Sequence, residues 1–154
     1  MMMRLSEAAQ ALHGHVVGDD VAFDAVSTDS RSVQAGDLFV ALRGERFDGH
    51  AYVTECLQRG AVAALVTQAV DGVGPQLVVA DTRLALGQLA EYWRGRFAIP
   101  LAAVTGSNGK TTVKEMLAAI LRAAAGGEEA VLATQGNLNN DIGLPMTLLK
   151  LRAQ

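Results

Sequence analysis

The residues best suited to chemistry stand in a short glycine-rich segment, residues 101–112, with the sequence LAAVTGSNGKTT. An apolar run, read as a buried strand, ends in a glycine turn followed at once by Lys-Thr-Thr. Gly106 and Gly109 let the backbone approach a ligand without a Cβ in the way. Loop N–H groups and the start of the next helix attract phosphate. Lys110 can then reach the β- and γ-phosphates, and the Thr111 hydroxyl can coordinate Mg²⁺.

The loop departs from the common phosphate-loop motif, which has one further glycine at a position taken here by Val104. A plain glycine turn beside an exposed lysine is therefore the structural alternative. The apolar residues that follow argue against it, because they recur at helical spacing up to a Gly-Gly stop. They are Val113, Met116, Leu117, Ile120, Leu121 and Ala124.

A second carboxylate for Mg²⁺ normally stands at the end of a later apolar strand in nucleotide triphosphatases of this kind. No acidic residue after Lys110 ends an apolar run, and Glu128 and Glu129 precede one at residues 130–133. Too few residues follow Thr112 to complete a doubly wound sheet around the loop. We therefore expect a truncated chain that carries half of an ATP site.

The elements that must position this loop alternate between helical and strand patterns, which predicts an α/β fold with a mostly parallel sheet flanked by helices. Helices are expected near residues 5–12, 49–59 and 82–97, with Ser6 and Asp81 as N-caps of the first and third. Strands are expected over residues 21–26, 37–42, 61–66, 76–80, 101–105 and 130–133.

Composition is typical of a cytoplasmic α/β protein. Half of the 154 residues are hydrophobic, and the formal net charge is −3 without a basic cluster, so we expect no nucleic-acid partner. No apolar run is long enough for membrane insertion, and the start lacks the apolar core of a signal peptide. The single cysteine, Cys56, fits a reducing compartment and a small buried side chain rather than a reactive thiol.

Two polar segments follow expected strands in the first half of the chain. Residues 27–31, STDSR, could bind a phosphate or sugar through the arginine, but they are equally typical of an ordinary turn. In residues 44–50, GERFDGH, Asp48 can be a helix cap and His50 a solvated or hydrogen-bonded residue. His13 and His15 lack partners at ligand spacing, which favours structural roles.

A third polar segment, residues 134–143, holds three asparagines within four positions. Capping of the next helix by Asn140 or Asp141 explains one of these residues, and Pro145 is tolerated in its first turn. Carboxamides offer donors and acceptors together, which suits a polar, uncharged ligand. Ligands of α/β proteins bind at strand ends, so the segment predicts a ligand surface.

These segments, in this order and spacing, resemble the ATP-dependent Mur ligases of peptidoglycan synthesis, over nearly the whole chain. The resemblance rests on STDSR, GDLFVALRGERFDGH, GAVAALV, VTGSNGKTTVKEM and TQGNLNNDIGLPMTLL. Within the family it favours the member that adds D-Ala-D-Ala to a UDP-N-acetylmuramoyl-peptide. The member that adds the third amino acid is the alternative, although it usually has Thr-Gly-Thr at the phosphate loop.

The resemblance implies a small N-terminal α/β UDP-substrate domain, residues 1–80. Residues 81–154 would be the incomplete start of a P-loop, mostly parallel-sheet ATP-binding domain. It implies ATP and Mg²⁺ as cofactors, and an acyl phosphate of the UDP-linked peptide that the amine of D-Ala-D-Ala attacks. The full-length protein is expected to be monomeric. A non-catalytic nucleotide-sugar-binding module is the alternative from another class.

The resemblance also implies a role for individual residues. ATP would be bound by Thr105, Gly106, Ser107, Asn108, Gly109, Lys110, Thr111 and Thr112. Lys110 would act catalytically on the phosphates, and Thr111 would bind Mg²⁺. The UDP-sugar would be faced by Ser30, Arg31, Glu45, Arg46 and Phe47. Asn137, Asn139 and Asn140 would lie between the substrate and the nucleotide.

Overall fold

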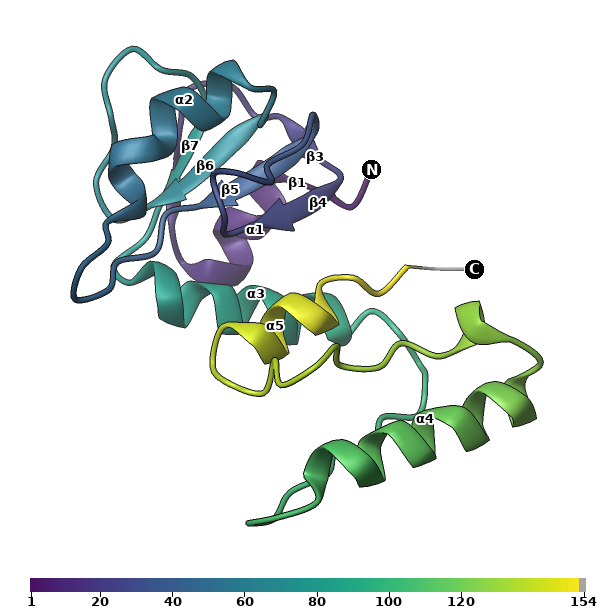
Figure 1. Ribbon diagram of the computed structural model, residues 1–154. Coiled ribbons are helices and arrows are strands. Elements are labelled where there is room, and N and C mark those ends of the chain that lie inside the picture. The colour runs from purple at the N-terminus through teal and green to yellow at the C-terminus, as the bar shows by residue number, and fades with distance from the viewer. Residues whose placement is uncertain (153–154) are drawn as a thin grey trace.

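The computed structural model describes residues 1–152, and its centre is a five-stranded sheet (Figure 1). The strands are β2 (His15–Val17), β4 (Ala25–Ser27), β5 (Asp37–Val40), β6 (Ala63–Val66) and β7 (Gln76–Val78). They lie in the order β2-β7-β6-β5-β4. Strands β4 to β7 pair in parallel, and β2 pairs antiparallel with β7 at one edge. The predicted α/β fold with a mostly parallel sheet is confirmed.

Helices cover both faces of this sheet (Figure 1). On one face lie α1 (Leu5–Leu12) and α3 (Thr82–Arg94), whose apolar residues join one core cluster with β5, β6 and β7. The other face carries the 3₁₀ turn η1 (Gly49–Tyr52) and α2 (Val53–Gln58), and α2 joins the second core cluster through Val53 and Cys56. The chain continues through α4 (Lys110–Ala125), η2 (Glu128–Ala130) and α5 (Gly143–Leu148), and α5 packs against α3.

The strand β5 contributes side chains to both apolar core clusters, one on each face of the sheet. Its residues Leu38, Phe39 and Val40 are apolar and fully buried, as is typical of a parallel strand covered on both faces. Leu38 and Val40 point into the core of α1 and α3, whereas Phe39 points into the core of α2. The sheet is therefore held between two apolar layers, and its strand ends are free to present polar loops.

Phe39→Ala should strongly destabilise the fold, because a fully buried ring would leave a cavity between β5 and α2. We expect a loss of about 3–5 kcal/mol in the free energy of unfolding. Urea denaturation followed by circular dichroism measures it. Leu84→Ala on α3 is the matched control, since Leu84 is 62% exposed and its truncation should change stability by less than about 0.5 kcal/mol. Equal losses in both variants would contradict the assigned core.

Several expected elements are confirmed. Asp81 caps α3, where its carboxylate accepts hydrogen bonds from the backbone N–H groups of Arg83 and Leu84. Gly126 ends α4 in the left-handed conformation, with φ of 88°. Cys56 is buried, and burial raises the pKa of its thiol. Within residues 1–152, no helix is both long and apolar enough to cross a membrane.

The first part of the chain corrects two predictions. The single strand expected over residues 21–26 is divided, because β3 (Ala22–Phe23) pairs with β1 (Met3–Arg4) while β4 joins the main sheet. Between them, the Asp24 N–H donates to the Gly36 carbonyl. Ser6 is not the N-cap of α1. Arg4 holds that position, and the Ser6 N–H and hydroxyl instead donate to the Asp20 carboxylate.

The second part of the chain lacks two expected strands. Residues 101–105 and 130–133 form no strand, since Ala130 ends η2 and residues 131–133 are irregular, and Leu101 is 56% exposed. A strand requires a neighbour for its backbone hydrogen bonds, and no described strand lies beside either segment. Helix α4 extends away from the main sheet (Figure 1), and within it only Ala118 is buried. The division into domains at residues 80 and 81 stays a prediction.

Candidate functional site

The glycine loop precedes α4 as predicted, and its geometry suits an anion. Gly109 is the N-cap of α4 with φ of 76°, a conformation that favours glycine, and no atom lies within 4 Å of the place where a Cβ would stand. The first helical bond joins the Val113 N–H to the Gly109 carbonyl. Within the described chain, the backbone N–H groups of residues 110–112 therefore have no hydrogen-bond partner. Phosphate oxygens are suitable acceptors for them.

Lys110 bends back over this loop. Its Nζ donates to the Gly106 carbonyl oxygen at 2.6 Å, so the ammonium group already lies above the open helix start. Thr105, Ser107 and Asn108 are exposed beside it. Because the cation and the unpaired N–H groups converge, the residues present fit the phosphate chain of a nucleotide.

The asparagine segment lies against the start of α4. The Thr111 hydroxyl donates to the Asn137 side-chain oxygen at 2.9 Å, which joins the predicted Mg²⁺ ligand to the predicted substrate surface. Lys114, one turn after Lys110, donates to the Thr134 and Gly136 carbonyls at 2.6 and 3.2 Å. The sequence analysis did not predict that Lys114 would contact the asparagine segment. Its position four residues after Lys110, on the same face of the helix, could have indicated this contact.

The other end of this segment is fixed by α5. The Asn140 side-chain oxygen accepts hydrogen bonds from the Ile142 and Gly143 N–H groups just before and at the start of α5. The expected N-cap at Asn140 or Asp141 is wrong, because Ile142 holds that position without a side-chain cap. A Cβ on Gly143 would lie 2.8 Å from the Leu138 backbone, and only glycine permits this close approach. Asp141 pairs with Arg83 of α3. The segment is thus held at both ends, with Asn137 and Asn139 exposed between them.

Residues 27–31 follow β4 and form a tight turn. The Asp29 carboxylate accepts two bonds from the Arg31 guanidinium, at 3.0 and 2.7 Å, and one from the Arg31 backbone N–H. The Nη1 group takes no part in this pair, and the Arg31 side chain is 88% exposed. Ser30 is buried, with its carbonyl accepting a hydrogen bond from Arg59. The turn therefore holds Arg31 in a fixed direction while leaving donors for a ligand.

The Arg31 guanidinium lowers the pKa of Asp29 from 3.8 to about 2. The folded state thus favours the carboxylate, and this contribution is present above pH 3.8 and lost as the pH falls through 2. Arg31→Ala should return the pKa of Asp29 toward 3.8, as measured by a carboxyl ¹³C NMR titration. Arg83→Ala is the control, since Arg83 pairs with Asp141 and should leave the pKa of Asp29 near 2. A pKa near 2 in Arg31→Ala would exclude the pair.

Residues 43–50 follow β5 and form a second polar loop. The Gly44 N–H donates to the Phe47 carbonyl at 2.7 Å, and Arg43 pairs with Asp48 at 3.1 Å. Asp48 caps η1, as expected, and the His50 backbone and ring hold the pKa of Asp48 below its usual range. Phe47 stacks on Tyr52, with ring centroids 5.8 Å apart, while Glu45 and Arg46 are exposed.

The structure brings some predicted site residues together and leaves others apart. Residues 27–31 and 43–48 follow the neighbouring parallel strands β4 and β5, so both loops begin at the same edge of the sheet. The glycine loop meets the asparagine segment through Thr111 and Asn137. Among residues 1–152, no hydrogen bond or ion pair joins these two pairs of segments to each other.

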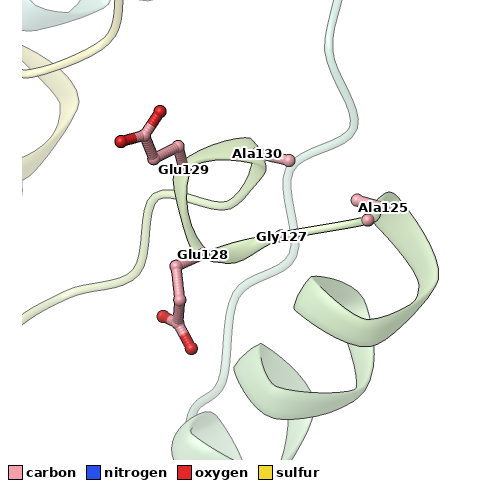
Figure 2. A pocket seen from close by; sticks show the side chains of 6 residues that line it. Ala125, Gly127, Glu128, Glu129 and Ala130 are labelled. Carbon is pink, nitrogen blue, oxygen red and sulfur yellow. The ribbon is translucent and has the colours of Figure 1, made fainter.

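A pocket lies elsewhere, away from these segments. It measures about 600 Å³, is lined by residues 125–130 and stands at the C-terminal end of α4, opposite Lys110. Figure 2 shows that Glu128 and Glu129 point in different directions around it. Its carboxylates would repel a polyphosphate, so it is not the nucleotide site. Residues 1–152 contain no group of three or more His, Cys, Asp and Glu residues placed to hold a metal ion.

Comparison with known families gives two matches. The first, the Mur ligase family, catalytic domain, covers residues 22–94. The second, the Mur ligase middle domain, covers residues 104–154 and includes both the glycine loop and the asparagine segment. Together the two matches include every segment that the sequence analysis assigned to a ligand.

Individual relatives agree with these matches. UDP-N-acetylmuramoyl-tripeptide–D-alanyl-D-alanine ligase of Escherichia coli (strain K12) is 50% identical over 96% of this chain and 32% of that protein. The crystal structure of MurF from Acinetobacter baumannii has a TM-score of 0.87 at 45% identity, covering 97% of this chain and 33% of that one. The Thermotoga maritima MurF ligase, in complex with ADP, has a TM-score of 0.71 at 35% identity, covering 81% and 28%. The chain spans about a third of the length of the curated relatives it matches.

Proposed function

The chain belongs to the Mur ligase family, and on that premise we propose that it contributes to a ligase joining D-Ala-D-Ala to UDP-N-acetylmuramoyl-tripeptide. Its residues would supply the UDP-substrate region and the start of the ATP-binding domain. The observation that supports the proposal is the 2.9 Å contact between Thr111 and Asn137, which joins the start of α4 to the asparagine segment. The names of the relatives point to the same reaction. The single buried cysteine fits a cytoplasmic location, and we expect a monomer.

ATP and Mg²⁺ are the cofactors in this proposal. ATP supplies the phosphoryl group that activates the peptide carboxylate as an acyl phosphate. The free N–H groups of residues 110–112 and the Lys110 ammonium would hold its phosphates. The Thr111 hydroxyl, now bonded to Asn137, offers one hard oxygen ligand for Mg²⁺. The Thermotoga maritima relative in complex with ADP supports an adenine nucleotide as a ligand.

The two ends of the substrate would be bound by different segments of the chain. Arg31 and Arg46 carry donors suited to a diphosphate, and Phe47 offers an exposed aromatic face for uracil, with Ser30 and Glu45 beside them. Asn137, Asn139 and Asn140 flank the phosphate loop, where the peptide carboxylate would meet ATP. We therefore assign recognition of the UDP end to the loops after β4 and β5, and the reacting end to the asparagine segment.

Phosphate release in a full-length ligase that carries these residues tests the proposal. UDP-N-acetylmuramoyl-tripeptide with ATP should release phosphate only when D-Ala-D-Ala is added. The dipeptide precursor with a third amino acid should give no release above background. The reverse preference would favour the family member that adds the third amino acid, and no release with either pair would favour a non-catalytic nucleotide-sugar module.

Arg31→Ala should weaken binding of the UDP-substrate by about 10-fold or more, because a charge-assisted contact is worth about 1.5–3 kcal/mol. Affinity for ATP should stay unchanged, since Arg31 lies outside the glycine loop. Asn139→Ala is the matched variant at the reacting end, and it should lower turnover more than UDP affinity. Calorimetry on material whose folding is checked by circular dichroism measures both. Equal UDP-substrate affinity in wild type and Arg31→Ala would remove Arg31 from the site.

A further inference from the structure

The His50 side chain connects segments that follow two different strands. Its Nδ1 lies 2.7 Å from the Asp48 Oδ1, and its Nε2 lies 2.9 Å from the Thr67 backbone nitrogen, just after β6. A backbone N–H can only donate, so Nε2 must be the acceptor. The ring proton therefore sits on Nδ1 and is donated to Asp48. With only 13% of its side chain exposed, His50 is fixed in one tautomer between two partners.

This contact anchors the loop of residues 43–48 to the sheet. The Gly49 N–H donates to the Leu42 carbonyl at 2.7 Å, and a Cβ on Gly49 would lie 2.9 Å from the Leu42 nitrogen. The turn is therefore packed directly against the chain that leaves β5. Asp48 accepts from Arg43 on one side and from His50 on the other. Because Thr67 belongs to the neighbouring strand segment, the loop cannot shift without breaking the His50 contacts.

The outer face of the anchored loop carries an aromatic pair. Phe47 and Tyr52 stack with an interplanar angle of 17°, and both remain partly exposed, at 44% and 38%. His50 lies between them in sequence, so one side chain fixes the backbone that holds both rings. Exposed aromatic faces stack on nucleobases, and the exposed Arg46 next to Phe47 can pair with a diphosphate.

We propose that His50 is a positioning residue for nucleotide recognition. By joining Asp48 to Thr67 it holds the Phe47–Tyr52 pair and Arg46 in the arrangement that receives the uracil and diphosphate of the substrate. Tyr52 thereby becomes part of the nucleobase-binding surface. This inference rests on the proposed function, since it assumes that the loop after β5 faces the UDP end.

The test uses the whole 154-residue chain and UDP itself as the probe, with affinity measured by calorimetry. His50→Ala removes both contacts and should weaken UDP binding by about 10-fold or more. His50→Asn can keep the donor to Asp48, and His50→Gln can keep the acceptor for Thr67, so each should recover part of the affinity. His15→Ala is the control, because His15 is exposed on β2 and should leave the affinity unchanged.

A ¹⁵N NMR measurement of the His50 ring separates positioning from folding. The wild type should show a protonated Nδ1 and an unprotonated Nε2, and UDP should perturb the Phe47 and Tyr52 ring signals. Unchanged UDP affinity in His50→Ala, or a loss no larger than the loss of folded protein seen by circular dichroism, would overturn the role of His50 alone. No UDP binding by the folded wild type would instead overturn the assignment of this region to the UDP end.

Discussion

Lys110→Ala should reduce nucleotide affinity of a full-length ligase carrying these residues by about 10–100-fold. The ammonium group would form a charge-assisted contact with the phosphates, and such a contact is worth about 1.5–3 kcal/mol. Its Nζ already lies 2.6 Å from the Gly106 carbonyl, so the side chain need not reorganise far to meet a ligand held by the loop. No other lysine or arginine in the described chain donates a hydrogen bond to this loop, and Lys114 donates to Thr134 instead. No second cation is therefore in place to compensate for the loss of Lys110.

The rate of phosphoryl transfer should fall further than the affinity. Charge develops on the transferring group, and a fixed cation stabilises that charge more in the transition state than in the ground state. Phosphate release at saturating ATP measures this additional effect. Lys150→Ala is the control, because Lys150 is exposed after α5 and far along the chain from the loop. Near-normal phosphate release by Lys110→Ala would falsify the assignment of Lys110.

The fold of the first half could be predicted because its apolar patterns are strong. The continuous apolar run of β5 and the helical spacing of Leu86, Leu89 and Trp93 in α3 each have one good structural interpretation. Short strands were harder to predict from the sequence. Residues 21–26 are apolar on both sides of Asp24, and the different partners of β3 and β4 divide them there. The edge strand β2 has three residues and no clear alternation, so it left no usable signal.

In the candidate site, too, local motifs could be predicted from the sequence but contacts between distant segments could not. The glycine loop is a local motif and was predicted residue by residue, although its binding roles stay predictions. The contacts of His50 with Thr67 and of Thr111 with Asn137 join residues 17 and 26 positions apart. Such contacts depend on how strands and helices pack, and residue types alone did not distinguish His50 from an ordinary solvated histidine.

The apolar face of α4 links the fold to activity. Val113, Met116 and Ile120 share the helix face that the sequence analysis assigned to a core, yet each is more than half exposed. The adjoining Leu101 is likewise exposed, and residues 101–105 pair with no described strand. In a P-loop domain the loop is held between a strand and a helix packed on the sheet. Within residues 1–152 the helix is formed, but no strand pairs beside it.

A polypeptide made of only these 154 residues should therefore show no ligase or ATPase turnover and at most weak ATP binding. Its glycine loop has Lys110 and the open start of α4, but among residues 1–152 no strand pairs beside the loop and no carboxylate cluster can complete a Mg²⁺ site. The measurement is phosphate release with ATP, UDP-N-acetylmuramoyl-tripeptide and D-Ala-D-Ala, compared with a no-enzyme control. Circular dichroism checks that the polypeptide is folded. D-Ala-D-Ala-dependent release above the control would mean that the loop and the asparagine segment are sufficient for catalysis.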